Sequence, residues 1–283
     1  MNQNLDKEKV LNVCLRAGIG DIIASKSVLL DRAPLINVKI NEGCLGLRGG
    51  ADYRVFLQNF AKLLFCEPEF CFQGFGPEPP TGWSDFGLDP KRLPFQTKLH
   101  ENIQSPVSGK YICITTKSRG PNGSTFFKEH EILVDGLKKI SNNIKIVLLG
   151  EKEIEVNSEV AYLKNFNMIS NIYDMAITIP GIIDMTIPKL GLTSPTFDVF
   201  QRDCACMANS IAVINSGQGG NTVFSSAVAR TVNLVENTTD PKNVYYLKPL
   251  TQMFPAFSYH TCSLSLLEEI NKLVDEKTNI IGE

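Results

Sequence analysis

Short apolar runs alternate with helix-length segments along most of this chain, and this alternation restricts its fold more than any other feature. Six apolar runs have the length of buried strands: residues 10–15, 35–40, 111–115, 144–149, 211–214 and 231–235. Five segments carry apolar residues at helical spacing: residues 22–30, 52–65, 126–140, 197–209 and 264–275. Strands that alternate with helices form parallel sheets through right-handed crossovers. The sequence therefore predicts an α/β fold.

A stretch rich in glycine, proline and aromatic residues, 74–94, divides these elements into two groups. Proline lacks a backbone N–H, so we expect a loop here rather than a helix or a central strand. A length of 283 residues fits one large domain or two of ordinary size. The sequence predicts two Rossmann-like domains, 1–105 and 106–283, with the N-terminal one reduced.

Composition and charge exclude several classes of partner. The formal net charge is -2 at pH 7, which gives no sign of nucleic-acid or membrane-surface binding. No apolar run approaches the roughly 20 residues of a membrane span, and the polar N-terminus has no signal-peptide core. The 8 cysteines include no CxxC pair. We therefore expect a cytoplasmic protein with free thiols, a metal or redox role being the alternative for the cysteines.

The segment 215–222, Asn-Ser-Gly-Gln-Gly-Gly-Asn-Thr, joins a predicted strand to a helix of small residues. Such a turn presents unpaired backbone N–H groups at the positive end of a helix, which suits phosphate. The alternative is purely structural, namely close packing of the helix on the strand. If the phosphate interpretation holds, the protein handles a phosphorylated small molecule.

A second glycine turn follows the first predicted strand. Gly18 and Gly20 would allow another backbone to approach closely, and Asp21 comes directly after them. The carboxylate of Asp21 could accept a proton from an incoming hydroxyl. Alternatively it could simply cap the free N–H groups of a helix.

Two more turns fall at the carboxyl ends of predicted strands, where ligands bind in open parallel sheets. Thr116, Lys117 and Arg119 follow strand 111–115, and the two cations would suit a diphosphate. Gly150 and Glu151 follow strand 144–149, and a carboxylate there could accept from ribose hydroxyls. The alternatives are an ordinary solvated loop and a charged surface turn. All four glycine and polar turns would share one cleft.

Several motifs are missing from the sequence. The first glycine turn is not a dinucleotide fingerprint because Ile23 replaces the third glycine, and no Walker A motif occurs. No Gly-x-Ser-x-Gly elbow marks a hydrolase, and no Asp-x-Asp pair would chelate a metal–diphosphate. His130, between Glu129 and Glu131, is predicted to lie on a helix surface, and His260 to be structural. No metal or cofactor is expected.

Three short stretches together resemble one enzyme family. They are Gly18–Ile23 followed by Ser27–Leu29, Lys145–Gly150, and Cys206–Gly217. In this order they are similar to heptosyltransferase-like enzymes, glycosyltransferase family 9. The resemblance implies the GT-B fold, in which two Rossmann-like domains face a central cleft. It also implies an N-terminal acceptor domain and a C-terminal domain that binds the nucleotide-sugar, a co-substrate rather than a cofactor.

The resemblance also implies roles for single residues. Asp21 matches the proposed catalytic base of a metal-independent transfer, and Gly18 and Gly20 lie on the acceptor side. Lys117 and Arg119 would neutralise the leaving diphosphate. The complete predicted donor-binding set is Thr116, Lys117, Arg119, Gly150, Glu151, Ser216, Gly217, Gln218, Gly219, Gly220 and Asn221.

The function expected from these residues is transfer of a sugar from a nucleotide-sugar to a hydroxyl of a glycan or glycoconjugate acceptor. Two alternatives stay open. One is a nucleotide-sugar epimerase or hydrolase on the same fold. The other is a non-catalytic protein that binds a nucleotide or a glycan. An acceptor-independent conversion of the nucleotide-sugar would indicate the epimerase, and the presence of Asp21 discriminates the transferase from the binding protein.

Overall fold

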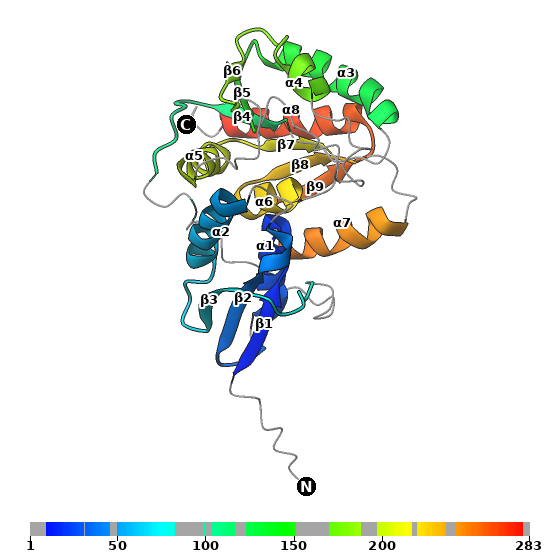
Figure 1. Cartoon of the computed structure of the whole chain (residues 1–283). Helices are drawn as coiled ribbons and strands as arrows, with labels where there is room; N and C mark the ends of the chain where they lie inside the picture. Colours follow the sequence, from blue (N-terminus) through cyan, green and yellow to red (C-terminus); the bar gives the residue numbers. More distant parts are fainter. Residues whose placement is uncertain are drawn as a thin grey trace.

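A computed structural model of the chain describes residues 10–30, 32–45, 50–82, 99, 103–116, 123–150, 170–187, 197–216, 220–235 and 241–279. Within them the chain forms two parallel β-sheets with helices, as the predicted α/β class requires. Figure 1 shows the smaller sheet at the bottom and the larger one above, with helices α1, α2 and α6 between them. No helix in the described part of the chain is long and apolar enough to cross a membrane.

The small sheet contains β1 (Leu11–Leu15), β2 (Ile36–Asn41) and β3 (Phe70–Gly76) in that order. The connecting helices are α1 (Ile19–Leu29) and α2 (Gly50–Leu64), with a short 3-10 turn, Glu42–Cys44, after β2. The predicted loop 74–94 is wrong at its start, because β3 continues through Gly76. Because β3 is an edge strand, it tolerates glycine, and the register of its pairing with β2 shifts between Val38 and Ile40.

The large sheet contains six parallel strands in the order β6-β5-β4-β7-β8-β9. They are β4 (Tyr111–Thr115), β5 (Lys145–Leu149), β6 (Ile183–Asp184), β7 (Val213–Ser216), β8 (Thr231–Leu234) and β9 (Phe257–His260). The first strand of this sheet, β4, lies in its middle. The next two, β5 and β6, extend the sheet to one edge, and β7 to β9 extend it from β4 to the other edge. Dinucleotide-binding Rossmann folds have this order, and their ligands bind where the direction reverses, between β4 and β7 here.

Helices connect the strands of the large sheet and cover its faces. They are α3 (Gly123–Ile140), α4 (Ser170–Ala176), α5 (Phe197–Ala208), α6 (Gly220–Val228), α7 (Pro241–Met253) and α8 (Ser263–Asn279). The sequence patterns predicted α3, α5 and α8 but left α4, α7 and β9 unassigned. One of these contradicts local propensity, because α7 contains Pro249, whereas β9 is an edge strand of only four residues.

One apolar core extends from the small sheet into the large one. Its centre is an aromatic cluster of Phe56 and Phe60 from α2, Phe197 and Phe200 from α5, and Phe224 from α6. The ring of Phe200 lies 5.0 Å from that of Phe56 and 4.6 Å from that of Phe224, measured between centroids. The two sheets are therefore joined by dense packing on this side. Division of the chain into domains at residue 105 stays a prediction.

Candidate functional site

The reversal point between β4 and β7 carries a buried network of neutral polar side chains. The hydroxyl of Thr115 at the end of β4 donates to the amide oxygen of Asn215 on β7. The amide nitrogen of Asn215 in turn donates to Ser225 in α6, whose hydroxyl contacts the carbonyl of Asn221 at 2.8 Å. The network joins two strands to the first turns of α6, so it fixes where that helix begins.

The end of β5 meets the end of β4 at a glycine. Gly150 has a φ of 102°, which side-chain-bearing residues rarely adopt, and a Cβ there would lie 2.7 Å from the hydroxyl oxygen of Thr116. Both the backbone N–H and the hydroxyl of Thr116 contact the carbonyl of Leu149, at 3.0 and 3.2 Å. Two predicted site residues, Thr116 and Gly150, therefore lie together, and Gly150 cannot be replaced without strain.

His130 is not on the surface as predicted but buried against the site. The side chain is 6% exposed, and its Nε2 lies 2.6 Å from Oγ of Ser216, the last residue of β7. The flanking glutamates suggested a solvated position, yet α3 turns the imidazole toward the sheet. Burial lowers the pKa of His130 from 6.5 to about 4, against a smaller opposing effect of Glu129. The imidazole is therefore neutral at physiological pH.

The beginnings of helices α1 and α6 touch each other. A Cβ built on Gly20 would lie only 2.7 Å from Cα of Gly220, so this contact requires glycine at position 20. The reverse is not true, because a Cβ on Gly220 would find its nearest neighbour, the Gly20 nitrogen, at 3.5 Å. The structure thus brings two predicted glycines together from opposite sheets. The first turns of both helices therefore lie together, and the N-terminus of a helix is the positive end of its dipole.

Asp21 is the third residue of α1 and is half-buried. Gly18 occupies the N-cap position, and its carbonyl accepts from the N–H of Ile22 at 2.9 Å. Asp21 is therefore not the N-cap of this helix, although an acidic residue in the first turn is favourable there. Asp21 follows Gly20 in the sequence, and Gly20 contacts Gly220, the first residue of α6. Asn221, the second residue of α6, is also half-buried.

Other predicted donor residues fall outside the described residues: Lys117, Arg119, Glu151, Gly217, Gln218 and Gly219. Their roles stay predictions. Among the residues that the structure describes, it brings Ser216, Gly220 and Asn221 to one location and Thr116 and Gly150 to another. Both locations lie at the carboxyl edge of the large sheet, on either side of the reversal point.

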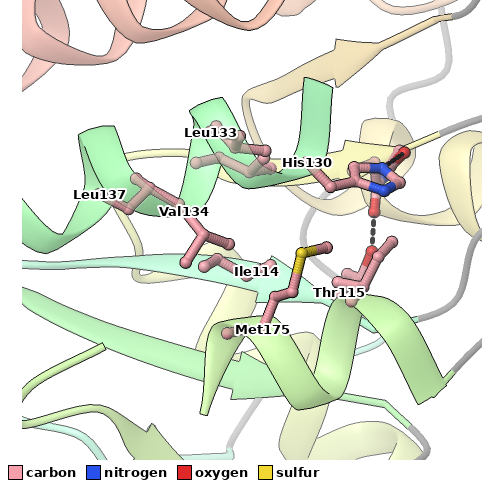
Figure 2. A pocket seen from close by; sticks show the side chains of 12 residues that line it. Ile114, Thr115, His130, Leu133, Val134, Leu137 and Met175 are labelled. Carbon is pink, nitrogen blue, oxygen red and sulfur yellow. Dashed lines mark hydrogen bonds between the residues drawn. The ribbon is translucent and has the colours of Figure 1, made fainter. Parts of the chain in front are cut away.

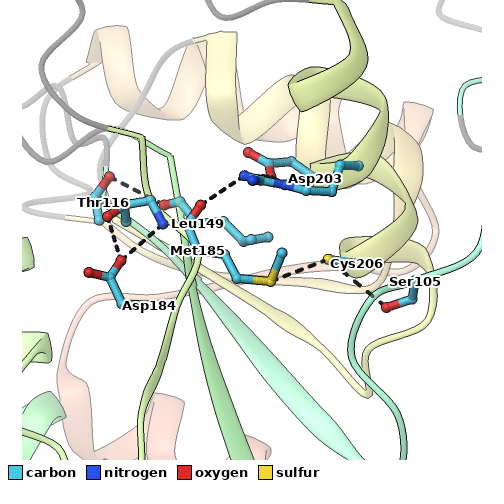
Figure 3. Close-up of polar contacts among 9 residues, drawn as sticks. Ser105, Thr116, Leu149, Asp184, Met185, Asp203 and Cys206 are labelled. Atoms are coloured by element: carbon cyan, nitrogen blue, oxygen red, sulfur yellow. Dashed lines mark hydrogen bonds and ion pairs between the residues drawn. The ribbon is translucent and has the colours of Figure 1, made fainter.

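Sequence reasoning missed a polar group at the end of β6. Asp184 accepts from the N–H and the hydroxyl of Thr186, at 3.0 and 2.5 Å, and from Tyr173 at 3.0 Å. The chain then stays beside β5, because the N–H of Ile187 donates to the carbonyl of Gly150 at 2.9 Å. Figure 3 shows Asp184 near Thr116 and Leu149. A strand of two residues, such as β6, leaves no recognisable pattern in the sequence.

Helix α5 places a second carboxylate below this edge. Asp203 pairs with the guanidinium of Arg202 at 2.6 Å, and Arg202 also donates to the carbonyl of Met185 at 2.8 Å (Figure 3). Burial raises the pKa of Asp203 from 3.8 to about 6 despite the opposing arginine. This carboxyl therefore changes charge near pH 6.

Three buried cysteines of β4 and α5 have thiols that resist ionisation. Burial raises the pKa of the Cys113, Cys204 and Cys206 thiols. Cys262 is exposed, and its pKa is lowered by hydrogen bonding to Ser265. Among the described residues, no group of three or more His, Cys, Asp or Glu is placed to hold a metal ion. His260 contacts Glu269 at 2.6 Å, in line with its predicted structural role.

A small cavity lies beneath the reversal point, between α3, α4 and the sheet. Figure 2 shows His130 and Thr115 at one end of it and Leu133, Val134 and Met175 along its sides. Its volume is about 20 Å³. That is room for one water molecule, so the cavity is not a nucleotide site.

Comparison with known proteins finds heptosyltransferases by structure. No family model and no curated protein sequence matches the chain. One similar solved structure is the dodecameric iron-containing heptosyltransferase TibC in complex with ADP-D-beta-D-heptose. Its identity is 14% and its TM-score 0.48, over 91% of this chain and 63% of TibC. The chain thus spans less than two thirds of the length of TibC.

Another similar structure is the E. coli heptosyltransferase WaaC with ADP, at 10% identity and a TM-score of 0.47, over 93% of this chain and all of that one. WaaC with ADP-2-deoxy-2-fluoro heptose matches equally, at 10% identity and 0.47. The proteins found are of the kind that the sequence motifs resemble.

Proposed function

We propose that this protein is a glycosyltransferase of GT-B type. It would move a sugar from a nucleotide-sugar to a hydroxyl of a glycan or glycoconjugate, without a metal ion and with Asp21 as general base. The contact between the starts of α1 and α6 carries this proposal. It brings the first turn of α1, which carries Asp21, to Gly220, the first residue of α6. A base and an anion site side by side are what this transfer needs.

In the proposed reaction the acceptor oxygen attacks the anomeric carbon as the bond from that carbon to the diphosphate breaks. Asp21 takes the proton of the acceptor hydroxyl. The start of α6 and the hydroxyl of Ser216 would donate hydrogen bonds to the diphosphate as it gains charge. Lys117 and Arg119 would add positive charge, and Glu151 would accept from the ribose. Thr116 and Gly150 would line the nucleotide side of this site.

The first test is substitution of the proposed base. Asp21→Asn keeps the size of the side chain but cannot accept the proton, so kcat should fall roughly 10²–10⁴-fold while donor affinity changes little. Asp198→Asn is the matched control, because Asp198 is also an acid in the first turn of a helix, α5. Sugar transfer at the wild-type rate by Asp21→Asn would rule out this base.

The second test is a thermal-shift screen against nucleoside diphosphates and their sugars. A ligand at 100 times its Kd should stabilise the folded protein by about 2.7 kcal/mol. No shift with any of them would rule out the donor site. Conversion of a nucleotide-sugar without any acceptor would instead point to the epimerase or hydrolase on this fold.

A further inference from the structure

His130, which forms a buried pair with Ser216, has no part in the transfer as described above. Ser216 ends β7, directly before the glycine-rich segment, and is 5% exposed. His130 reaches it from the neighbouring helix α3, with 2.6 Å between Nε2 and Oγ. Such a short contact between two buried groups fixes the rotation of the serine side chain.

The position of His130 is itself fixed from the far side of α3. The preceding residue, Glu129, accepts from the backbone N–H of Ser263 at 2.6 Å, and the Ser263 hydroxyl donates to the carbonyl of Glu129. The start of α8 therefore holds α3 at the residue next to His130. Below the imidazole lie the apolar side chains of the small cavity, including Leu133 and Val134 (Figure 2). The imidazole thus follows the residue that is hydrogen-bonded to the start of α8, and it lies against the apolar side chains of the cavity.

The chemistry of the pair depends on which group donates. A neutral imidazole has one N–H and one acceptor nitrogen, and a serine hydroxyl has a single proton. If Nε2 accepts, the proton of Ser216 is used inside the protein. If Nε2–H donates, Ser216 keeps its proton for a ligand. An anion in the following glycine-rich turn needs donors, so only the second arrangement adds one.

We propose that His130 is a positioning residue whose Nε2–H donates to Ser216, so that the Ser216 hydroxyl points its own proton at the diphosphate. His130 itself does not touch the ligand. This inference rests on the proposed function, because it names the group that prepares the donor site. The neighbouring Asn215 cannot take this part, since its side chain is used by Thr115 and Ser225.

Calorimetric titration with ADP and with inorganic pyrophosphate tests the proposal. His130→Leu and Ser216→Ala should each weaken binding roughly tenfold, the effect of one hydrogen bond to a charged group. The double variant should be no weaker than Ser216→Ala alone, because His130 acts only through that hydroxyl. His130→Gln retains an N–H donor and should bind within about threefold of wild type.

Val134→Ala is the matched control, because it disturbs the same cavity without a polar group. It should lower the unfolding temperature and leave both affinities unchanged. A purely structural His130 would behave like Val134. Side-chain ¹⁵N NMR should in addition find the Nε2–H tautomer in the wild-type protein.

The outcomes distinguish the role of His130 from the proposed function. If the wild type binds ADP and His130→Leu binds it equally well, the inference is wrong and the proposed function stands. The Nδ1–H tautomer, or additive losses in the double variant, would also overturn the inference alone. If the wild type binds neither ADP nor pyrophosphate, the proposed function falls and the inference falls with it.

Discussion

Among the described residues, the two sheets differ in whether a charged side chain is buried beside the neutral polar ones. In the small-sheet unit (β1–β3, α1 and α2), Lys26 is 1% exposed, and its ammonium contacts both oxygens of Glu67, at 2.7 and 2.8 Å, and the carbonyl of Leu64. In the described part of the large-sheet unit (β4–β9 and α3–α8), the polar side chains below 9% exposure are neutral and include Thr115, His130 and Ser216.

This difference indicates which buried polar groups serve packing and which are available to bind a ligand. A buried ion pair satisfies itself and leaves little for a ligand, so it holds α1 against the end of α2. Neutral hydroxyl, amide and imidazole groups can donate to an anion without a competing carboxylate beside it. Within the described residues, the small-sheet unit therefore contains a buried ion pair that is satisfied internally, and the large-sheet unit keeps neutral groups at the edge where ligands bind.

Breaking the ion pair should have the largest effect. Lys26→Met leaves Glu67 and the carbonyl of Leu64 without their ammonium partner, which should cost about 3–5 kcal/mol of unfolding free energy. For a chain of this size the unfolding midpoint should fall by roughly 10 °C. Differential scanning calorimetry measures both quantities.

Lys39→Met is the matched control, because the Lys39–Glu78 pair is exposed by 35% and 44% and should leave the midpoint almost unchanged. Adding Glu67→Gln to Lys26→Met should recover part of the loss, since the uncompensated charge is removed. Equal midpoints for Lys26→Met and Lys39→Met would contradict the role given to the buried pair.

The pH dependence of stability should differ in sign between two groups of the large-sheet unit. The pKa of His130 is depressed from 6.5 to about 4, so its contribution is present above pH 6.5 and is lost as pH falls toward 4. The pKa of Asp203 is raised from 3.8 to about 6, so its contribution is present below pH 3.8 and is lost as pH rises through 6.

Between pH 4 and pH 6 these contributions, roughly 2–3 kcal/mol each, oppose one another. His130→Gln should therefore show stability that falls with rising pH over this range, relative to wild type. Asp203→Asn should show stability that rises. Urea denaturation at a series of pH values measures the two slopes, and slopes of the same sign in both variants would contradict the assignment.

The contact between the two units should depend on one glycine more than on its partner. Gly20→Ala places a methyl group against the backbone of Gly220 and should cost about 1–3 kcal/mol. Gly220→Ala has ordinary van der Waals space and should change stability by less than about 1 kcal/mol, in either direction. Chemical denaturation of the two variants side by side would show equal losses if the helices do not touch as described.

The smallest effect is expected at a neutral hydrogen bond of the large-sheet unit. The hydroxyl of Tyr111 donates to the carbonyl of Cys206 at 2.9 Å and pairs with Ser105 at 2.8 Å, and burial raises its pKa to about 12. Tyr111→Phe should cost about 1–2 kcal/mol. Tyr259→Phe, on the exposed edge strand, should cost nothing measurable, and equal midpoints for the two variants would contradict the role given to Tyr111.

Much of the fold could be predicted because strand and helix periods are local properties. The strands at 111–115 and 144–149 were each expected within a residue of where they lie. Helix α7 was missed because Pro249 disfavours a helix, and β9 because four residues are too few for a clear pattern, although Phe257 and Tyr259 favour a strand. Helix α4 is short, and its ambiguous pattern was resolved only by packing against α3.

The sequence by itself determined the α/β class, the turns at strand ends and the identity of Gly18, Gly20, Asp21, Thr116, Gly150 and Ser216 as candidates. Tertiary structure alone decided that His130 is buried against Ser216 and that Gly20 meets Gly220. The physical reason is distance along the chain. Periodicity and turn chemistry act over a few residues, whereas these contacts join residues 86 and 200 positions apart. Only the packing of two sheets around one apolar core brings such residues together.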